Sequence, residues 1–128
     1  MTQMNPIPES PDAILAGNRA GDIVAQFGSP VYVYSERILR ERCRELMGMV
    51  SGISWRPDYS MKANGNLKLL EIIRDEGLHC DTMSPGETSI AMAAGFTPEQ
   101  ILFVPNNVFA EELLDAVKRG VMVSLDSL

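Results

Sequence analysis

Cysteine and histidine are scarce in this sequence. Its 128 residues include only two cysteines, Cys43 and Cys80, and one histidine, His79. Two thiols are too few for the disulfide framework of a small secreted domain, and one histidine is too few for the usual zinc-ligand patterns. We therefore expect both thiols to be reduced and structural, and we expect no metal centre.

Basic residues and long apolar runs are also in short supply. The chain has 11 Lys and Arg against 17 Asp and Glu, a net charge of −6, and no basic cluster that could neutralise several phosphates. Nowhere do about 18 apolar residues follow one another, and the first thirty residues contain no apolar run of signal-peptide length. We expect a cytoplasmic protein that binds neither nucleic acid nor membrane.

What the sequence does contain is an alternation of predicted strands and helices. Apolar residues make up 45% and charged residues 22%, which is ordinary for a globular domain, and the length suits one domain. Residues 1–11, with three prolines, are expected to form an extended arm. The β-branched runs, helical spacings and Gly, Pro or Ser punctuation predict strands over 31–34, 58–62, 78–83, 101–104 and 121–125, and helices over 35–50, 66–77, 84–95 and 107–119.

Short apolar strands that alternate with helices are typical of a parallel sheet covered by helices, so the predicted fold class is α/β. Two architectures remain open at this point. A five-stranded flavodoxin-like sheet fits the length but needs a helix after its last strand, and the sequence stops at Leu128 without one. A (β/α)8 barrel needs about 250 residues, so in that case the chain is only part of a barrel.

Lys62 is the first residue to which chemistry can be assigned. It lies at the carboxyl end of the strand predicted over 58–62, and in parallel α/β folds that edge faces the ligand. A lysine that is partly desolvated there can act as an amine nucleophile toward a carbonyl. A solvated lysine that opens a loop is the alternative, and spacing alone favours it.

Several segments around Lys62 resemble a known family. Residues 59–66 (YSMKANGN), 80–87 (CDTMSPGE) and 94–101 (AGFTPEQI) are similar to successive blocks of diaminopimelate decarboxylase, a member of the fold-type III, alanine racemase-like pyridoxal-phosphate enzymes. Residues 105–107 and 121–127 continue the resemblance in the same order. One such block is weak support, whereas five collinear blocks are strong.

The resemblance implies a role for Lys62 and for four neighbours. In the family a lysine at this position forms the internal Schiff base with pyridoxal 5′-phosphate, and the amino-acid substrate displaces it before losing its α-carboxylate as CO2. Lysine is required because its primary amine forms an imine that exchanges readily. The resemblance also implies cofactor contacts for Asp81, Ser84, Glu87 and Asn106.

The same residues have structural alternatives. Ser84 and Glu87 satisfy a capping box, Asp81 can be an acid that flanks a helix, and Asn107 can cap the next helix. His79 does not match the histidine that stacks on the cofactor in the family, so we expect it to be structural.

The resemblance further implies an organisation and a reaction. Residues 35–128 are expected to form the first half of a (β/α)8 TIM barrel, about four of its eight strands, and residues 1–34 an arm and strand associated with a β domain absent from the chain. The expected reaction converts meso-diaminopimelate to L-lysine and CO2 in lysine biosynthesis, in a homodimer when full-length, and this portion alone is expected to be inactive. The alternatives are a decarboxylase of ornithine or arginine type, or a non-catalytic pyridoxal-phosphate-binding protein.

Overall fold

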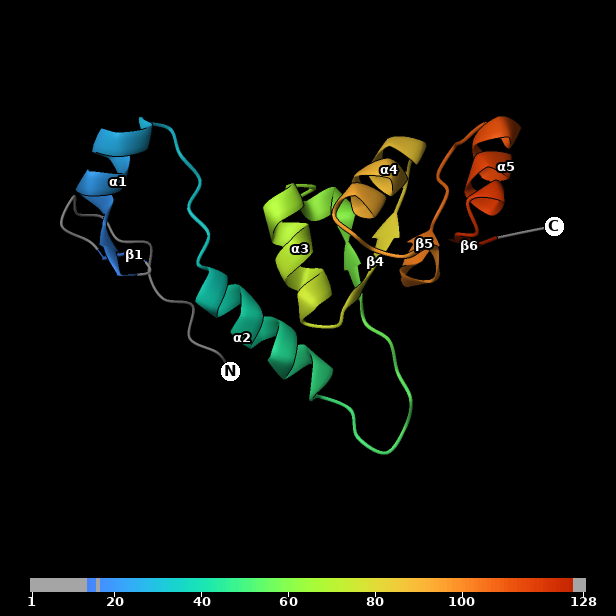
Figure 1. Cartoon of the computed structure of the whole chain (residues 1–128), viewed down its shortest axis with the longest axis horizontal. Helices are drawn as coiled ribbons and strands as arrows, with labels where there is room; N and C mark the ends of the chain where they lie inside the picture. The colour runs from blue at the N-terminus through green and yellow to red at the C-terminus, as the bar shows by residue number, and fades with distance from the viewer. Residues whose placement is uncertain (1–13, 16, 126–128) are drawn as a thin grey trace. The chain divides into compact units, whose positions relative to one another are not determined.

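The computed structural model describes residues 14–15 and 17–125 (Figure 1). The chain divides into two compact units, Met1–Ile38 and Leu39–Leu128. The arm predicted over residues 1–11 lies outside the described residues. None of the described helices is long and apolar enough to cross a membrane.

The first unit contains a small hairpin and one helix. Strands β1 (Ile14–Leu15) and β2 (Asn18–Arg19) pair antiparallel, and α1 (Ala20–Phe27) follows directly. The prediction of a strand over 31–34 is wrong, because this segment has no strand assignment and belongs to neither of the described sheets. Its β-branched and aromatic residues favour extended backbone, but a strand also needs a neighbour to complete its hydrogen bonds.

Helix α2 (Glu36–Met47) confirms the helix predicted after Ser35. The Ser35 hydroxyl accepts a 3.4 Å hydrogen bond from the Ile38 backbone N–H, as an N-cap does. Within the second unit, the apolar residues of α2 recur at helical spacing and face the core. They are Leu39, Cys43, Leu46 and Met47.

The second unit is built on one parallel sheet. Its strands follow the order β3 (Asp58–Ser60), β4 (His79–Thr82), β5 (Ile101–Phe103) and β6 (Met122–Val123), and every neighbouring pair is parallel. The helices α3 (Leu67–Asp75), α4 (Pro85–Ala93) and α5 (Ala110–Lys118) connect successive strands and lie side by side (Figure 1). The four strands predicted to belong to the barrel are thus confirmed, and they form one sheet. Residues 31–34 are not part of this sheet.

The predicted helix boundaries are largely confirmed where a cap is present. Asn66 caps α3 by accepting a hydrogen bond from Lys68 N–H at 3.0 Å, and Ser84 caps α4. The strand predicted over 58–62 ends earlier, at Ser60, because Met61–Ala63 forms the short 3-10 helix η1. A second 3-10 helix, η2 (Pro98–Gln100), precedes β5.

The two faces of the sheet differ in character. Cys80, Thr82, Ile101 and Phe103 each have 0% exposed surface and pack in the core with the helices. Side chains alternate between faces along a strand, so Asp81 and its register partners Ser60 and Leu102 lie on the opposite face. Their half-buried side chains form the face that lies inside a closed barrel.

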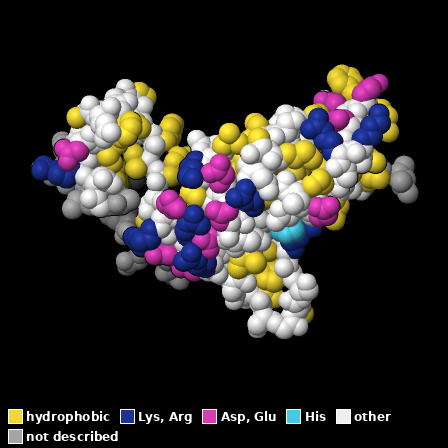
Figure 2. Space-filling view, viewed as in Figure 1, with side chains coloured by type: hydrophobic (Ala, Val, Ile, Leu, Met, Phe, Trp, Pro, Cys, Tyr) yellow, Lys and Arg dark blue, Asp and Glu magenta, His cyan; other side chains and the backbone are white. Residues whose placement is uncertain are grey.

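An ion-pair network fastens α2 to the end of α3. Glu76, whose side chain is only 9% exposed, accepts hydrogen bonds from Arg44 Nε at 2.6 Å and from Arg40 Nη1 at 2.9 Å. Arg44 and then Arg40 hold the pKa of the Glu76 carboxyl below its usual value. Figure 2 shows basic and acidic side chains intermingled over α2.

Glu76→Gln is therefore expected to lower the thermal unfolding midpoint at neutral pH, because it removes the negative charge to which both arginines bind. The folded-state pKa lies below the unfolded one, so the ionised carboxylate stabilises the fold above the ordinary Glu pKa. This contribution is lost as the pH falls through the folded-state pKa. Thermal scans across the acidic range should show the two proteins converging. Glu45→Gln, in the exposed pair with Arg42, is the control and should change little; a pH-independent difference for Glu76→Gln would contradict this account.

Candidate active site

The predicted site residues lie at one edge of the sheet, where the parallel strands end. Lys62 is in η1 directly after β3, Asp81 is in β4, Ser84 follows β4, and Asn106 follows β5. Three successive β/α connections thus contribute to the same edge. In parallel α/β folds this edge is where ligands bind.

The turn that carries Lys62 is fixed at both ends. Met61 is 2% exposed and anchors the turn in the core, and the Tyr59 hydroxyl donates a 3.1 Å hydrogen bond to the Asn64 carbonyl oxygen. The Asn64 side chain then accepts a hydrogen bond from the Asn66 backbone N–H at 3.0 Å. These contacts hold the Lys62 backbone in place while its side chain remains exposed.

The Lys62 amine is available for chemistry. Within residues 14–15 and 17–125 it takes part in no hydrogen bond or ion pair. A primary amine at the ligand edge of a parallel sheet can attack a carbonyl carbon once it is deprotonated. The geometry is therefore compatible with the nucleophile predicted from the sequence.

Asp81 is held by a residue that the sequence analysis missed. Ser60 Oγ lies 2.9 Å from Asp81 Oδ1, and the two residues are register partners on β3 and β4. An ionised carboxylate only accepts hydrogen bonds, so the serine hydroxyl is the donor. Ser60 lies two residues before Lys62, but a lone serine in a predicted strand gives no signal until the strand register is known.

Ser84 and Glu87 are engaged in the local structure of α4. Ser84 Oγ accepts a 3.2 Å hydrogen bond from Glu87 N–H, and Glu87 Oε2 accepts one from Met83 N–H at 2.6 Å. Thr88 adds a 3.1 Å bond to the Ser84 carbonyl oxygen. This arrangement is close to the capping box expected from the sequence, and contact of either residue with a cofactor stays a prediction.

Asn106 and Asn107 lie in the exposed loop after β5. The alternative that Asn107 caps the next helix is wrong, since α5 begins at Ala110 and its N-cap residue is Phe109. Glu112 accepts a 2.8 Å hydrogen bond from Phe109 N–H and so satisfies the helix start without an asparagine. Asn107 instead adopts a φ of 56°, in the left-handed region that asparagine tolerates in turns.

The cysteines and the histidine have structural positions, as expected. Cys43 and Cys80 are buried free thiols, and burial is the main cause that raises the pKa of Cys80 to about 12. His79 and Asp58 are the first residues of β4 and β3 and lie opposite each other in the strand register. They are therefore at the amino end of the sheet, away from the edge that carries Lys62. Burial, followed by the nearby Arg56 charge, lowers the His79 pKa.

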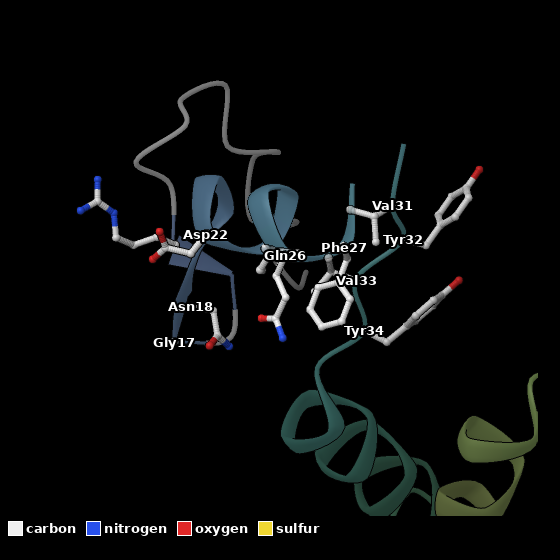
Figure 3. A pocket seen from close by; sticks show the side chains of 11 residues that line it. Gly17, Asn18, Asp22, Gln26, Phe27, Val31, Tyr32, Val33 and Tyr34 are labelled. Atoms are coloured by element: carbon white, nitrogen blue, oxygen red, sulfur yellow. The ribbon is translucent and has the colours of Figure 1, made fainter. Parts of the chain in front are cut away.

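A cavity of about 700 Å3 lies in the first unit, far in sequence from Lys62 (Figure 3). It lies between α1 and the extended segment 31–34, and its lining includes Phe27, Tyr32 and Tyr34. None of the predicted site residues lines it. The candidate site is therefore defined by the strand ends and not by this cavity.

Parallel strands joined by helices, with a fixed lysine turn at the carboxyl edge, define an α/β protein whose ligand edge presents a primary amine. The model of one family, described as pyridoxal-dependent decarboxylase, pyridoxal binding domain, matches residues 36–128. The chain belongs to this family, and its cofactor is pyridoxal phosphate.

Curated relatives and solved structures agree with this assignment. The chain is 38% identical over 116 residues to diaminopimelate decarboxylase of Methanothermobacter thermautotrophicus, covering 89% of this chain, and 39% identical over 116 residues to that of Mycobacterium leprae, covering 90%. It spans only 27% and 24% of the lengths of these two relatives. A crystal structure of AQ1208 from Aquifex aeolicus matches 94% of this chain and 30% of its own, with a TM-score of 0.79 and 26% identity.

A crystal structure of a Helicobacter pylori diaminopimelate decarboxylase variant complexed with L-lysine has the same fold. Its TM-score is 0.78 at 24% identity, and the match covers 84% of this chain and 27% of that one. The four parallel strands of the second unit are thus the first half of a (β/α)8 barrel. The expected fold class is confirmed.

The described residues fit one end of pyridoxal phosphate. Its aldehyde carbon requires a primary amine that other side chains leave free, and the Lys62 amine meets this condition. The half-buried Asp81, on the strand beside the one that precedes Lys62, supplies an acidic group at the same edge. The residues present are therefore suited to covalent attachment of the cofactor.

Proposed function

We propose that the full-length protein is a pyridoxal-phosphate-dependent amino-acid decarboxylase that converts meso-diaminopimelate to L-lysine and CO2. The main support for this proposal is the Lys62 amine, which lies on a fixed turn at the ligand edge after β3, while Asp81 lies on the neighbouring strand β4. The curated relatives, which are named diaminopimelate decarboxylases, support the choice of substrate.

The described residues have distinct tasks in this reaction. Pyridoxal phosphate, when bound, supplies an acceptor for the electron pair left when the bond to the α-carboxylate breaks. Lys62 would hold the cofactor through its amine until the amine of the substrate displaces it. Asp81 places a negative charge at the same edge, and Tyr59, through Asn64, keeps the Lys62 turn in position. CO2 leaves, and a proton takes its place on the α-carbon.

Cofactor contacts of Ser84, Glu87 and Asn106 are part of the proposal. Ser84 and Glu87 lie on the connection after β4, and Asn106 on the connection after β5, so all three are at the edge that carries Lys62. Asn106 is exposed. A structure of the cofactor-bound protein tests these contacts, and a cofactor beyond hydrogen-bonding distance of all three residues would remove them from the site.

We further propose that the chain is the N-terminal portion of a longer polypeptide that is active as a homodimer in the cytoplasm. The support is that the chain spans about a quarter of the length of its relatives, and that its described part contains four parallel strands where a closed barrel has eight. The homodimer and the cytoplasmic location rest on the family resemblance alone. Sedimentation of the full-length protein tests the dimer, and a monomer at micromolar concentration would contradict it.

Residues 1–34 are proposed to associate with a β domain supplied by the rest of that polypeptide. Phe27, Tyr32 and Tyr34 are 67%, 87% and 57% exposed, and the β-branched and aromatic segment 31–34 belongs to neither of the described sheets. Such a segment is suited to pair with a strand of another domain. A structure of the full-length protein in which 31–34 remains unpaired would contradict this arrangement.

The substrate proposal is tested by measuring CO2 release from a panel of amino acids. The full-length protein with pyridoxal phosphate is expected to release CO2 from meso-diaminopimelate in preference to L-ornithine and L-arginine, with L-lysine as the second product. Preference for ornithine or arginine would identify the related decarboxylase type. Cofactor binding with no CO2 from any amino acid would indicate a non-catalytic pyridoxal-phosphate-binding protein.

A further inference from the structure

Ser60 and Asp81 meet on the face of the sheet that lies inside the barrel. They are register partners on the parallel strands β3 and β4. Their neighbours Tyr59 and Cys80, also paired, face the helices, where Cys80 is fully buried and Tyr59 packs against the core. Packing of the opposite face therefore fixes the backbone from which both polar side chains project.

The contact between them is a direct hydrogen bond to a carboxylate. Ser60 Oγ donates to Asp81 Oδ1 at 2.9 Å, and both side chains are half-buried. Hydrogen bonds to charged acceptors are stronger than neutral ones, and partial burial reduces competition from water. A bond of this kind restricts the orientation of the Asp81 carboxylate.

Ser60 also belongs to the element that carries the lysine. It is the N-cap residue of η1, with Lys62 two positions later, and Asn64 at the other end of η1 is held by Tyr59. The Ser60 side chain thus connects the turn of the proposed nucleophile to the acidic residue on the next strand. Nothing in the local secondary structure requires this contact, because the Ser60 side chain makes no cap hydrogen bond to η1.

We propose that Ser60 is a positioning residue, which orients the Asp81 carboxylate toward the cofactor attached to Lys62. The proposal rests on the proposed function, since it concerns the same cofactor site. Ser60 itself need not touch the cofactor. Its effect on cofactor binding therefore passes through Asp81, and the two residues should be energetically coupled.

A double-mutant cycle on cofactor affinity tests this coupling. The full-length protein, freed of cofactor, is titrated with pyridoxal phosphate and followed by visible absorption, with Ser60→Ala, Asp81→Asn and the double variant compared. Ser60→Ala should weaken binding about tenfold, the scale of one hydrogen bond to a charged group. The double variant should bind within about twofold of Asp81→Asn alone, because the serine then has no carboxylate to orient.

Two further variants separate positioning from general structural damage. Ser60→Thr retains the hydroxyl and should restore affinity to within about twofold of the wild type. Ser54→Ala removes the hydroxyl of an exposed serine in the loop before β3, at the opposite end of the strands, and should leave affinity unchanged. The thermal unfolding midpoint of cofactor-free Ser60→Ala should fall by no more than about 4 °C, because the substitution removes one hydrogen bond and no apolar core contact.

The outcomes separate the two proposals. Suppose that borohydride reduction attaches the cofactor to Lys62 in the wild type. If Ser60→Ala then binds the cofactor normally, or if it weakens binding as much in Asp81→Asn as in the wild type, the role of Ser60 is overturned. The proposed function stands in either case. If the wild type is not modified at Lys62, both are overturned. Coupled loss of affinity with rescue by Ser60→Thr supports the positioning role.

Discussion

Lys62→Ala is expected to reduce decarboxylation by the full-length protein on the order of 10³-fold or more, the scale seen when a catalytic nucleophile is removed. The Lys62 side chain is exposed, and no described residue forms a hydrogen bond or ion pair with its amine. The substitution therefore removes the nucleophile without removing a core contact. The thermal unfolding midpoint of the cofactor-free protein should therefore stay near that of the wild type. The measurement is CO2 release at saturating pyridoxal phosphate.

Lys68→Ala is the matched control for Lys62→Ala. Lys68 is an exposed lysine six positions later, at the start of α3, and among residues 17–125 its ammonium group pairs with the carboxylate of Glu71 at 3.1 Å. This variant should retain activity. Near wild-type turnover of Lys62→Ala, or an equal loss in both variants, would exclude the role of Lys62.

Phe103→Ala is expected to lower the free energy of unfolding by about 3–5 kcal/mol, the usual cost of removing a large buried ring. Phe103 is 0% exposed and lies on β5, where it packs in the core shared by the sheet and its helices. The deletion leaves a cavity that the surrounding side chains fill only in part. Denaturant unfolding of the full-length protein, followed by circular dichroism, measures the loss.

Phe109→Ala provides the comparison for the same change of residue type. The Phe109 side chain is 76% exposed, so its truncation should cost less than about 0.5 kcal/mol. Similar losses in the two variants would mean that β5 and α5 are packed differently from this structure. A small effect of Phe103→Ala alone would have the same meaning.

The sequence predicted best those elements whose ends are set by local chemistry. Asn66 and Ser84 begin α3 and α4 as expected, because an N-cap side chain satisfies the first backbone N–H groups within a few residues. The parallel sheet was predicted from short apolar strands between these helices. The lysine at the end of the second predicted strand followed from the same alternation.

Features that depend on partners distant in sequence were not predictable in the same way. Residues 31–34 have strand-forming side chains, yet they become a strand only if another segment completes their hydrogen bonds. The contact of Ser60 with Asp81 depends on the register of β3 against β4, which no local pattern specifies. Helix α1 was not predicted at all, and none of its described residues is buried in the structure.

Covalent trapping of the cofactor tests the central claim most directly. The full-length protein is incubated with pyridoxal phosphate and reduced with borohydride, and the modified peptide is located by mass spectrometry. We predict one pyridoxyl group, on Lys62 within the turn Met61–Ala63. Stable modification at another lysine, with Lys62 unmodified, would contradict the account.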